Sequence, residues 1–226
     1  MRIFHDRIEA GNALGARVSQ LGLSGPLLVL GLPRGGVPVA CEVATALAAP
    51  VDVLVVRKLG APFNPELAVG AIAFGGVTVY NEPLLDQLGL DEESIAPIRA
   101  RELEELERRE RAYRGTKPPP DLEGKTVVIV DDGIATGATM HAAVVAARKL
   151  APRRILAAAP TSAVDAVVRL EEVADRVVVL HTPEPYFGVG AWYEEFPQLS
   201  DGDVLDALER SERIQAAATP RNSGLA

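Results

Sequence analysis

The stretch VVIVDDGIATGAT, residues 127–139, combines groups that suit a phosphorylated sugar. Asp131 and Asp132 follow an apolar run expected to be a strand, and the turn at 133–139 leads into a helix expected to begin near Met140. Such a turn directs backbone N–H groups and the helix dipole at one place, which favours a phosphate. Carboxylates beside a phosphate repel it unless they accept hydrogen bonds from hydroxyls or coordinate a metal. A sugar phosphate supplies both the hydroxyls and the phosphate.

Other interpretations of this stretch are weaker. A capped helix start would account for one aspartate, but not for the pair together with the Thr-Gly-Ala-Thr turn. A nucleoside triphosphatase needs G-x-x-x-x-G-K-[ST], whereas the GKT at residues 124–126 has Pro119 at the first glycine position and precedes a predicted strand. The GVGAWY sequence has Tyr193 where a dinucleotide-binding motif has its third glycine. We reject the nucleoside triphosphatase and the dinucleotide-binding motif, and we keep helix capping as the alternative.

A second candidate site is GLPRGGVPVA, residues 31–40, which follows another predicted strand. Arg34 offers a planar cationic fork that suits phosphate. Gly35 and Gly36 let the backbone approach a ligand closely. An ordinary strand-to-helix turn with a solvated arginine is the alternative.

A third candidate is VVRKLGAPFNPELAVG, residues 55–70. Arg57 and Lys58 bring positive charge to a loop rich in glycine and proline. Surface charge is the alternative for Lys58. Glu66 could assist proton transfer, but an exposed structural glutamate is an equal alternative.

Aromatic residues are concentrated near the C-terminal end. Five of the ten aromatics in the chain lie within PEPYFGVGAWYEEF, residues 183–196. Stacking on an aromatic side chain favours a planar ligand of unspecified identity. A hydrophobic flap packed on the core is the alternative.

Composition excludes several classes of function. The 226-residue chain is long enough for one sizeable core, and its formal net charge of −8 argues against a nucleic-acid binder. Cys41 is the single cysteine, which forbids an internal disulfide and a cysteine-based zinc cluster, and we expect it to be a buried structural thiol. No apolar run is long enough to span a membrane, and residues 1–11 lack a signal-peptide core. We expect a reduced, cytoplasmic protein.

Short apolar runs alternate with alanine-rich helical runs along the chain. The runs are continuously apolar, which is typical of parallel strands covered on both faces, so the sequence predicts an α/β fold with a parallel five-stranded sheet flanked by helices. The predicted strands are 27–30, 51–56, 126–130, 154–159 and 176–180, and the predicted crossover helices are 37–48, 141–151 and 162–174.

Residues 57–120 break this rhythm. They contain the Gly- and Pro-rich loop, strand candidates at 71–74 and 77–80, and a highly charged helix at 91–115 with several Glu–Arg pairs. We interpret the segment as a hood over one sheet edge, completed by the C-terminal segment. One domain at 1–215 with an aromatic flap at 183–199 is expected, followed by a disordered tail at 216–226.

Residues 127–139 resemble the signature of the type I phosphoribosyltransferases, which use 5-phosphoribosyl-1-pyrophosphate (PRPP), and the similarity extends over most of the chain. The resemblance implies that Asp131 and Asp132 hold the ribose 2′- and 3′-hydroxyls and take part in catalysis. It also implies a set of residues that wrap the 5′-phosphate: Ala135, Thr136, Gly137, Ala138 and Thr139.

The same resemblance assigns the other two loops. The family has a pyrophosphate-binding loop, often with a cis peptide, at the position of Arg34, Gly35 and Gly36. Adenine-type members have a similar Arg-Lys pair before a flexible loop, which implies that the loop closes over the reaction and excludes water. The same resemblance implies that Arg57 and Lys58 contact pyrophosphate and that Lys58 assists catalysis.

The aromatic stretch is similar to the F-x-V-G-x-x-x-[DE] segment of the hypoxanthine-guanine enzymes. By that resemblance Phe187 and Val189 contact the acceptor, and Glu194 lies near the metal and pyrophosphate. The implied cofactor is Mg²⁺, held by Asp131, Asp132 and Glu194 mostly through PRPP and water.

Two departures from the family concern the acceptor. Ala135 stands where the hypoxanthine-guanine enzymes have an aspartate, and AAAPTSA, residues 157–163, lacks their lysine. These changes disfavour a 6-oxopurine, and Ala135 matches the adenine-type signature. The chain is most similar to bacterial phosphoribosyltransferase-like proteins of unassigned acceptor.

We therefore expect a Mg²⁺-dependent transferase that moves phosphoribosyl from PRPP to a nitrogenous small-molecule acceptor, a nucleobase or related planar amine, and that forms a homodimer. Two alternatives stay open. One is a non-catalytic sensor that binds PRPP or a nucleotide and regulates a partner. The other is slow hydrolysis of PRPP or of another phosphorylated sugar.

Overall fold

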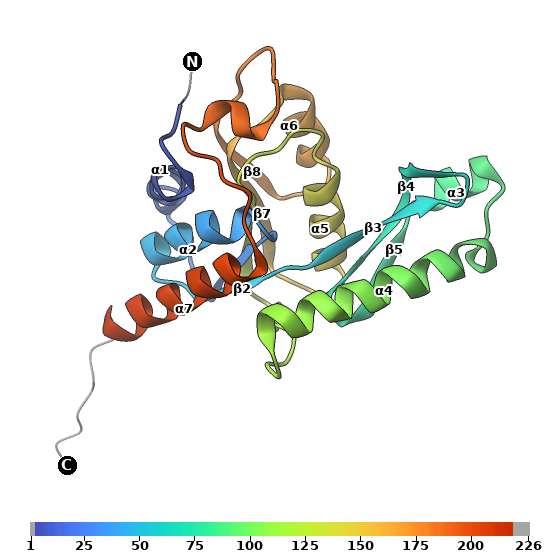
Figure 1. The fold of residues 1–226 in the computed structure, drawn as a ribbon, viewed down its shortest axis with the longest axis horizontal. Coiled ribbons are helices and arrows are strands. Elements are labelled where there is room, and N and C mark those ends of the chain that lie inside the picture. The colour runs from blue at the N-terminus through green and yellow to red at the C-terminus, as the bar shows by residue number, and fades with distance from the viewer. Residues whose placement is uncertain (1–2, 219–226) are drawn as a thin grey trace.

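Five parallel strands form the central sheet of the structure, a computed structural model that describes residues 3–218, with the backbone alone described for residues 65, 66, 74 and 218. Their order is β2-β1-β6-β7-β8, and all four neighbouring pairs are parallel (Figure 1). The predicted five-stranded sheet is thereby confirmed. The strands are β1 (Leu27–Gly31), β2 (Val51–Val53), β6 (Thr126–Val130), β7 (Arg154–Thr161) and β8 (Arg176–His181).

Helices cover both faces of this sheet, which explains its continuously apolar strands. In β6, Val128 and Val130 pack with the cluster that includes α2 (Gly36–Leu47) and α1 (Arg7–Ser19). The alternate residues Val127 and Ile129 pack with the cluster of α5 and α6. Helices α5 and α6 span Ala138–Arg148 and Val164–Glu171, and α7 (Asp201–Ala218) lies along α2.

The segment at 57–120 forms a second, antiparallel sheet of order β3-β4-β5, which extends to one side of the core (Figure 1). Its elements are β3 (Val56–Ala61), β4 (Asn64–Ala73), the short 3₁₀ turn η1 (Phe74–Gly76), β5 (Val77–Tyr80), α3 (Glu82–Leu88) and α4 (Glu92–Arg114). One face of this sheet packs on α4, and α5 of the core contacts all three strands.

Two predictions for this region were wrong. The predicted strand at 51–56 is divided, because β2 ends in the central sheet and Val56 begins β3 of the second sheet. The predicted flexible loop that follows is a β-hairpin, and the strand expected at 71–74 is only the end of β4. Burial against α4 overrides the glycine and proline signals, since Leu59 and Ile72 are fully buried in one cluster with Leu106.

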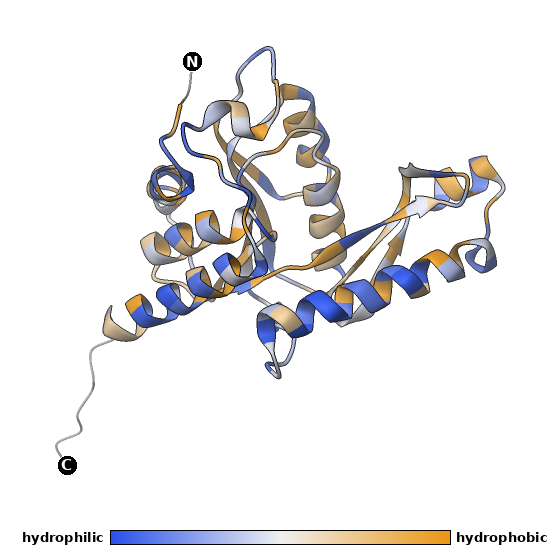
Figure 2. Ribbon diagram, viewed as in Figure 1, coloured by the Kyte–Doolittle hydropathy of each residue, from blue (hydrophilic) through white to orange (hydrophobic). Residues whose placement is uncertain are grey.

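Helix α4 agrees with the charged helix predicted at 91–115. Asp91 caps it by accepting a hydrogen bond from the Ser94 N–H at 2.9 Å. Glu105 pairs with Arg108 at 2.7 Å and with Arg109 at 2.8 Å on one side of the helix. Figure 2 shows α4 as largely hydrophilic along its length. The few buried apolar side chains of the helix attach it to the second sheet.

The N-terminal segment pairs with residues 192–195, the segment before α7, beside the central sheet. The N–H groups of Ile3 and Phe4 both donate to the carbonyl of Trp192, and the Glu194 N–H donates to the carbonyl of Phe4 at 2.9 Å. Trp192 is the last residue of η2 (Val189–Trp192), and the chain continues from this pairing to α7. Helix α7 includes residues 216–218 of the predicted tail, and residues 219–226 lie outside the described residues.

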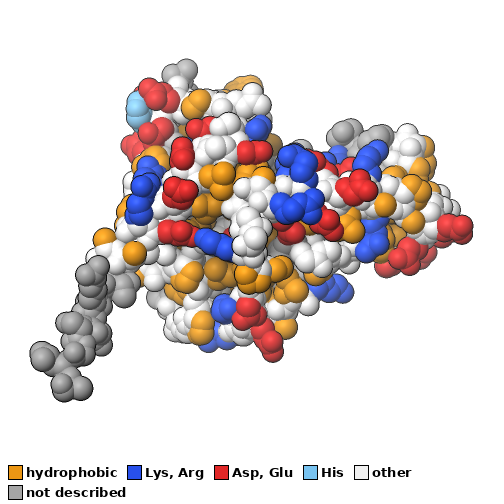
Figure 3. All heavy atoms as spheres, turned by 60° about the horizontal axis from the view of Figure 1, so that its bottom comes forward, with side chains coloured by type: hydrophobic (Ala, Val, Ile, Leu, Met, Phe, Trp, Pro, Cys, Tyr) orange, Lys and Arg blue, Asp and Glu red, His pale blue; other side chains and the backbone are white. Residues whose placement is uncertain are grey.

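Charges of both signs are interspersed on the surface. On the face turned forward in Figure 3, Lys and Arg side chains lie beside Asp and Glu side chains. Ion pairs such as Lys117–Glu212 and Arg210–Glu42 contribute to this pattern. Within residues 3–218, every helix is too short or too polar to cross a membrane.

Candidate functional site

The acidic pair lies at the carboxyl end of β6, in the middle of the central sheet. The Asp131 N–H donates to the carbonyl of Ala158 in the neighbouring strand, and the Asp132 N–H donates to Oδ1 of Asp131 at 2.9 Å. Asp131 is half-buried and Asp132 is buried. Ligands of open parallel sheets bind at this edge, so the pair occupies the position that the sequence predicts.

The loop at 31–36 packs directly against this pair. Gly35 is so close to Asp132 that an added Cβ would collide with its carboxylate, and a Cβ on Gly36 would lie 2.6 Å from the carbonyl oxygen of Val130. The peptide bond between Pro33 and Arg34 is cis, and the Arg34 side chain is exposed. The structure therefore brings together the first two sites predicted from the sequence.

The turn after the acidic pair leads into α5 as expected. Its start is fixed to β7, because the Ile134 N–H donates to the carbonyl of Thr161 at 2.9 Å. Gly137, with φ of 76°, precedes the first residue of α5. Thr136 and Thr139 are exposed there, and the first N–H groups of a helix have no acceptor within the helix. The geometry leaves hydroxyls and N–H groups available to an anion.

Burial and mutual repulsion shift the titration of the acidic pair. Burial raises the pKa of the Asp131 carboxyl well above its usual range, and the charge of Asp132 raises that pKa further. Burial also raises the pKa of Asp132, while the positive charge of Arg7 opposes the shift. The pair thus resists carrying two negative charges unless a cation or hydroxyl donors compensate.

Arg7 is a residue that sequence reasoning missed. Its Nε donates to Oδ2 of Asp132 at 2.8 Å, and its Nη1 donates to the carbonyl of Pro197 at 3.0 Å. The guanidinium carbon lies 3.8 Å from the ring centre of Phe196. No pattern in the sequence connects residue 7 with residue 132, because the contact depends on how the N-terminal segment pairs with residues 192–195.

The aromatic segment at 183–199 is divided between the core and the surface. Trp192 and Tyr193 are buried, and the Tyr193 hydroxyl donates to the backbone carbonyl of Asp132 at 2.5 Å. Burial raises the pKa of Tyr193, which keeps this hydroxyl protonated as a donor. Val189 packs against Gly133, next to the acidic pair, whereas the Phe187 side chain is 77% exposed.

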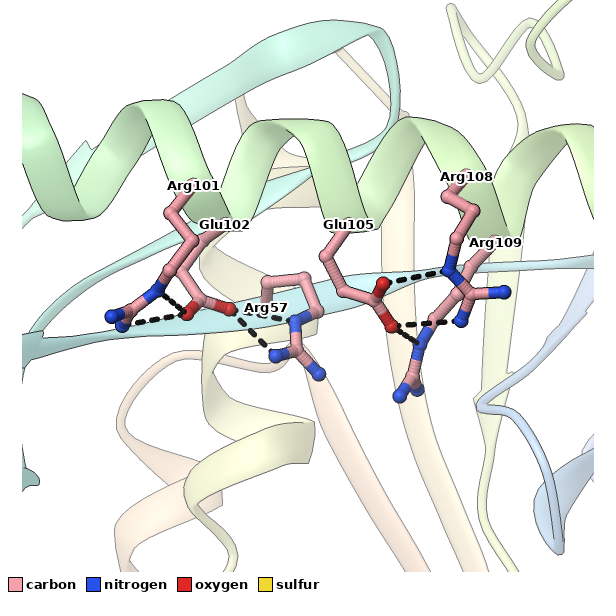
Figure 4. A network of polar contacts seen from close by, with 6 residues as sticks. All are labelled: Arg57, Arg101, Glu102, Glu105, Arg108 and Arg109. Atoms are coloured by element: carbon pink, nitrogen blue, oxygen red, sulfur yellow. Dashed lines mark hydrogen bonds and ion pairs between the residues drawn. The ribbon is translucent and has the colours of Figure 1, made fainter.

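The Arg-Lys pair lies in β3 of the second sheet. Oε2 of the buried Glu102, in α4, accepts from Nε of Arg57 at 2.9 Å and from Nη2 at 2.6 Å (Figure 4). Lys58 is exposed and lines a cavity of about 350 Å³ with Arg57, Arg101 and Glu102. The Glu66 side chain lies outside the described residues. Pyrophosphate contacts by Arg57 and Lys58 therefore stay predictions.

The acidic pair suits a magnesium ion that is mainly held by its substrate. Within residues 3–218, clusters of three or more His, Cys, Asp or Glu able to hold a metal are absent. Mg²⁺ commonly binds through one or two carboxylates together with substrate phosphates and water, which Asp131 and Asp132 can satisfy. Glu194 is exposed and interacts with Nδ1 of His5 at 3.1 Å. Its role as a metal ligand stays a prediction.

Comparison with known proteins connects this arrangement to a family. A family model described as the phosphoribosyl transferase domain matches residues 9–193. Proteins of Mycobacterium tuberculosis strains CDC 1551 and H37Rv, provisionally named phosphoribosyl transferases, are both 47% identical over 228 residues. The match covers 97% of this chain and 51% of each relative, so the chain spans about half the length of these curated relatives.

A solved structure agrees in both fold and sequence. The crystal structure of TT1426 from Thermus thermophilus superposes with a TM-score of 0.85 at 43% identity, covering 93% of this chain and 99% of that one. The family match spans the acidic pair, the turn before α5 and the loop at 31–36. The chain therefore belongs to the phosphoribosyl transferase domain family.

Proposed function

We propose that this protein is a Mg²⁺-dependent phosphoribosyltransferase, which moves the phosphoribosyl group of PRPP to a nitrogenous acceptor and releases pyrophosphate. The observation that carries the proposal is the contact between Gly35 and the Asp132 carboxylate, beside the turn that opens α5. Two segments that are far apart in sequence, residues 31–36 and 131–139, thus contribute carboxylates, backbone N–H groups and an arginine to the same edge of the sheet. PRPP has a complementary distribution of hydroxyls, phosphate and pyrophosphate.

Each group of PRPP has a proposed partner. Asp131 and Asp132 accept hydrogen bonds from the ribose 2′- and 3′-hydroxyls. The backbone N–H groups of residues 135–139 and the Thr139 hydroxyl bind the 5′-phosphate, with support from the dipole of α5. Arg34 binds the pyrophosphate with the backbone of Gly35 and Gly36.

The chemistry follows from the charge that develops as the bond to pyrophosphate breaks. The C1–oxygen bond of PRPP lengthens toward an oxocarbenium-like ribosyl cation, and the acceptor nitrogen forms the new bond at C1 before losing its proton. The protein mainly positions the reactants and stabilises charge. Mg²⁺ bound with PRPP supplies neutralisation of the pyrophosphate charge.

For the acceptor we propose a planar nitrogen base that contacts Phe187 and Val189. Val189 lies beside the acidic pair through its packing on Gly133, and the exposed Phe187 offers a ring face. At the end of β7 the fully buried Thr161 hydroxyl lies 3.1 Å from the Tyr186 hydroxyl. That pair provides neutral hydrogen-bonding groups in a region without a lysine, which disfavours a 6-oxopurine. The homodimer and the cytoplasmic location stay predictions.

The test follows PRPP by ³¹P NMR with protein, Mg²⁺ and a pool of nucleobases and small amines. Pyrophosphate that forms only with an acceptor present would support the transferase, and division of the pool would then identify the acceptor. Chelation of Mg²⁺ by EDTA should abolish turnover. Ribose 5-phosphate formed without an acceptor would instead indicate hydrolysis, and PRPP binding without turnover would favour the sensor.

Asp132→Asn tests the sugar site directly. Loss of one charge-assisted hydrogen bond should weaken PRPP binding about 10- to 100-fold by calorimetry, with the fold intact by circular dichroism. Asp86→Asn, an exposed aspartate in α3, is the matched control and should bind as the wild type does. Equal PRPP affinity in Asp132→Asn and the wild type would contradict the proposed role.

A further inference from the structure

The side chain of Arg7 reaches from the first turn of α1 to the carboxylate at the centre of the site. Arg7 and Asp132 are 125 positions apart in sequence, yet Nε of Arg7 lies 2.8 Å from Oδ2 of Asp132. The exposed fraction of the side chain is 9% for Arg7 and 13% for Asp132. A charge pair this well buried interacts strongly and is little screened by salt.

Besides Asp132, two residues of the segment before α7 contact the guanidinium. The Nη1 group donates to the Pro197 carbonyl, and the ring of Phe196 lies 3.8 Å from the guanidinium carbon. The Asp6 side chain caps α1 by accepting from the Glu9 N–H at 2.8 Å, which fixes the first turn of that helix. Arg7 is therefore fixed before any ligand binds.

Two further contacts restrain Asp132. The Tyr193 hydroxyl holds its backbone carbonyl, and Gly35 packs against its carboxylate. Because Arg7 binds Oδ2, it fixes the rotation of the carboxylate that a sugar hydroxyl would meet. Residues 7, 196 and 197 all lie outside residues 9–193, the part of the chain matched by the family model.

We propose that Arg7 is a positioning residue, which holds the Asp132 carboxylate in the orientation that binds a ribose hydroxyl of PRPP; this rests on the proposed function. The first turn of α1 and the segment at 196–197 thereby contribute to substrate binding without touching the substrate. Arg7 acts through Asp132, so its loss should weaken PRPP binding more than it slows the bound complex. If Arg7 only joined α1 to the segment at 196–197, its replacement would lower stability and leave PRPP affinity unchanged.

The first experiment measures PRPP affinity with Mg²⁺ by calorimetry for the wild type, Arg7→Gln and Arg7→Lys. The expected result is affinity weakened about 10- to 100-fold in Arg7→Gln, with partial recovery in Arg7→Lys, whose ammonium can replace one of the two hydrogen bonds. With an acceptor in hand, KM for PRPP should rise more than kcat falls. Arg17→Gln, an exposed arginine of the same helix, is the matched control and should bind as the wild type does.

A double variant separates positioning from a structural role. If Arg7 acts through the Asp132 carboxylate, Arg7→Gln should weaken binding no further in the Asp132→Asn background, within about twofold. Independent losses that multiply would overturn the proposal.

Chemical rescue provides a second, independent readout. A groove of about 470 Å³, lined by Arg7 with Asp6, Pro38 and Pro197, leads to the arginine from the surface. Guanidinium ion added to Arg7→Ala should therefore restore part of the PRPP affinity, and it should have no such effect on Asp132→Asn.

The outcomes distinguish this inference from the proposed function. A wild type that does not bind PRPP would overturn both. A wild type that binds PRPP, with undiminished binding by folded Arg7→Gln or Arg7→Lys, would overturn only the role of Arg7. If Arg7→Gln fails to fold, Arg7→Lys decides, because it keeps the charge and loses one contact.

Discussion

The Glu102 carboxylate binds the Arg57 guanidinium across 45 positions of sequence and thereby connects α4 to β3 (Figure 4). Glu102 also accepts from Nε of Arg101 at 3.2 Å and from its Nη2 at 3.1 Å, so one buried carboxylate serves two arginines. The exposed fraction of the side chain is 29% for Arg57 and 71% for Arg101. The Arg57 pair is thus the better shielded of the two and contributes more to holding the helix on the hairpin.

Replacing Glu102 should loosen the attachment of α4 to the hairpin. Glu102→Gln removes the charge that pairs with Arg57, and we expect the free energy of unfolding to fall by about 1–3 kcal/mol. Urea unfolding monitored by circular dichroism measures the change. Glu104→Gln, at an exposed position of the same helix, should differ from the wild type by less than about 0.5 kcal/mol. A similar loss of unfolding free energy in both variants would mean that the net charge of the helix, and not this ion pair, determines the stability.

A methyl group at residue 35 should block the site. In Gly35→Ala the new Cβ would collide with the Asp132 carboxylate, so the loop or the carboxylate must move. We expect PRPP binding to weaken by roughly 100-fold or more, since small displacements in such sites cost about this much. Calorimetry measures the affinity. Gly202→Ala is the control, because its Cβ would meet its nearest atom outside the local backbone at an ordinary 3.5 Å. Wild-type affinity in Gly35→Ala would refute the packing argument.

The sequence predicts the central sheet well because local and tertiary signals agree there. The predicted strand at 126–130 coincides with β6, whose residues are all buried between two helical layers. The hairpin at 56–73 was missed because its glycines and prolines indicate a loop. Its stability comes from packing of Leu59 and Ile72 on α4, a contact across about 40 residues that no local pattern reports.

The residues of the candidate site also fall into those that a local pattern predicts and those that it does not. Asp131, Asp132 and the turn before α5 are contiguous and could be predicted together, and Arg34–Gly36 follow a strand in a similar manner. Arg7 could not be predicted, because its role depends on the pairing of residues 3–5 with residues 192–195 at the edge of the core. Only the three-dimensional arrangement shows which of the chain's arginines pairs with Asp132.

Cys41 should react slowly in the native protein. Its thiol is buried, as predicted, and burial raises its pKa to about 11. At pH 8 roughly 0.1% would be thiolate, against about a quarter for an exposed thiol. Iodoacetamide labelling should therefore be at least about 100-fold slower in the native protein than in urea. Its rate should rise about tenfold per pH unit from pH 7 to 9. Native labelling within tenfold of the unfolded rate would contradict this.

Removing the Phe187 ring should affect the acceptor and not the fold. Its side chain is 77% exposed, so Phe187→Ala loses little buried area and its melting temperature should stay within about 2 °C of the wild type. Base stacking on an aromatic contributes about 1–3 kcal/mol, which predicts a rise of roughly 5- to 150-fold in the acceptor KM with the PRPP KM unchanged. Steady-state kinetics with both substrates varied separates the two constants.

Phe63→Ala is the matched control, because Phe63 is 63% exposed and lies between β3 and β4. Equal acceptor KM values for the two variants would contradict acceptor binding at Phe187. A rise in the acceptor KM confined to Phe187→Ala would support stacking of the acceptor on that ring.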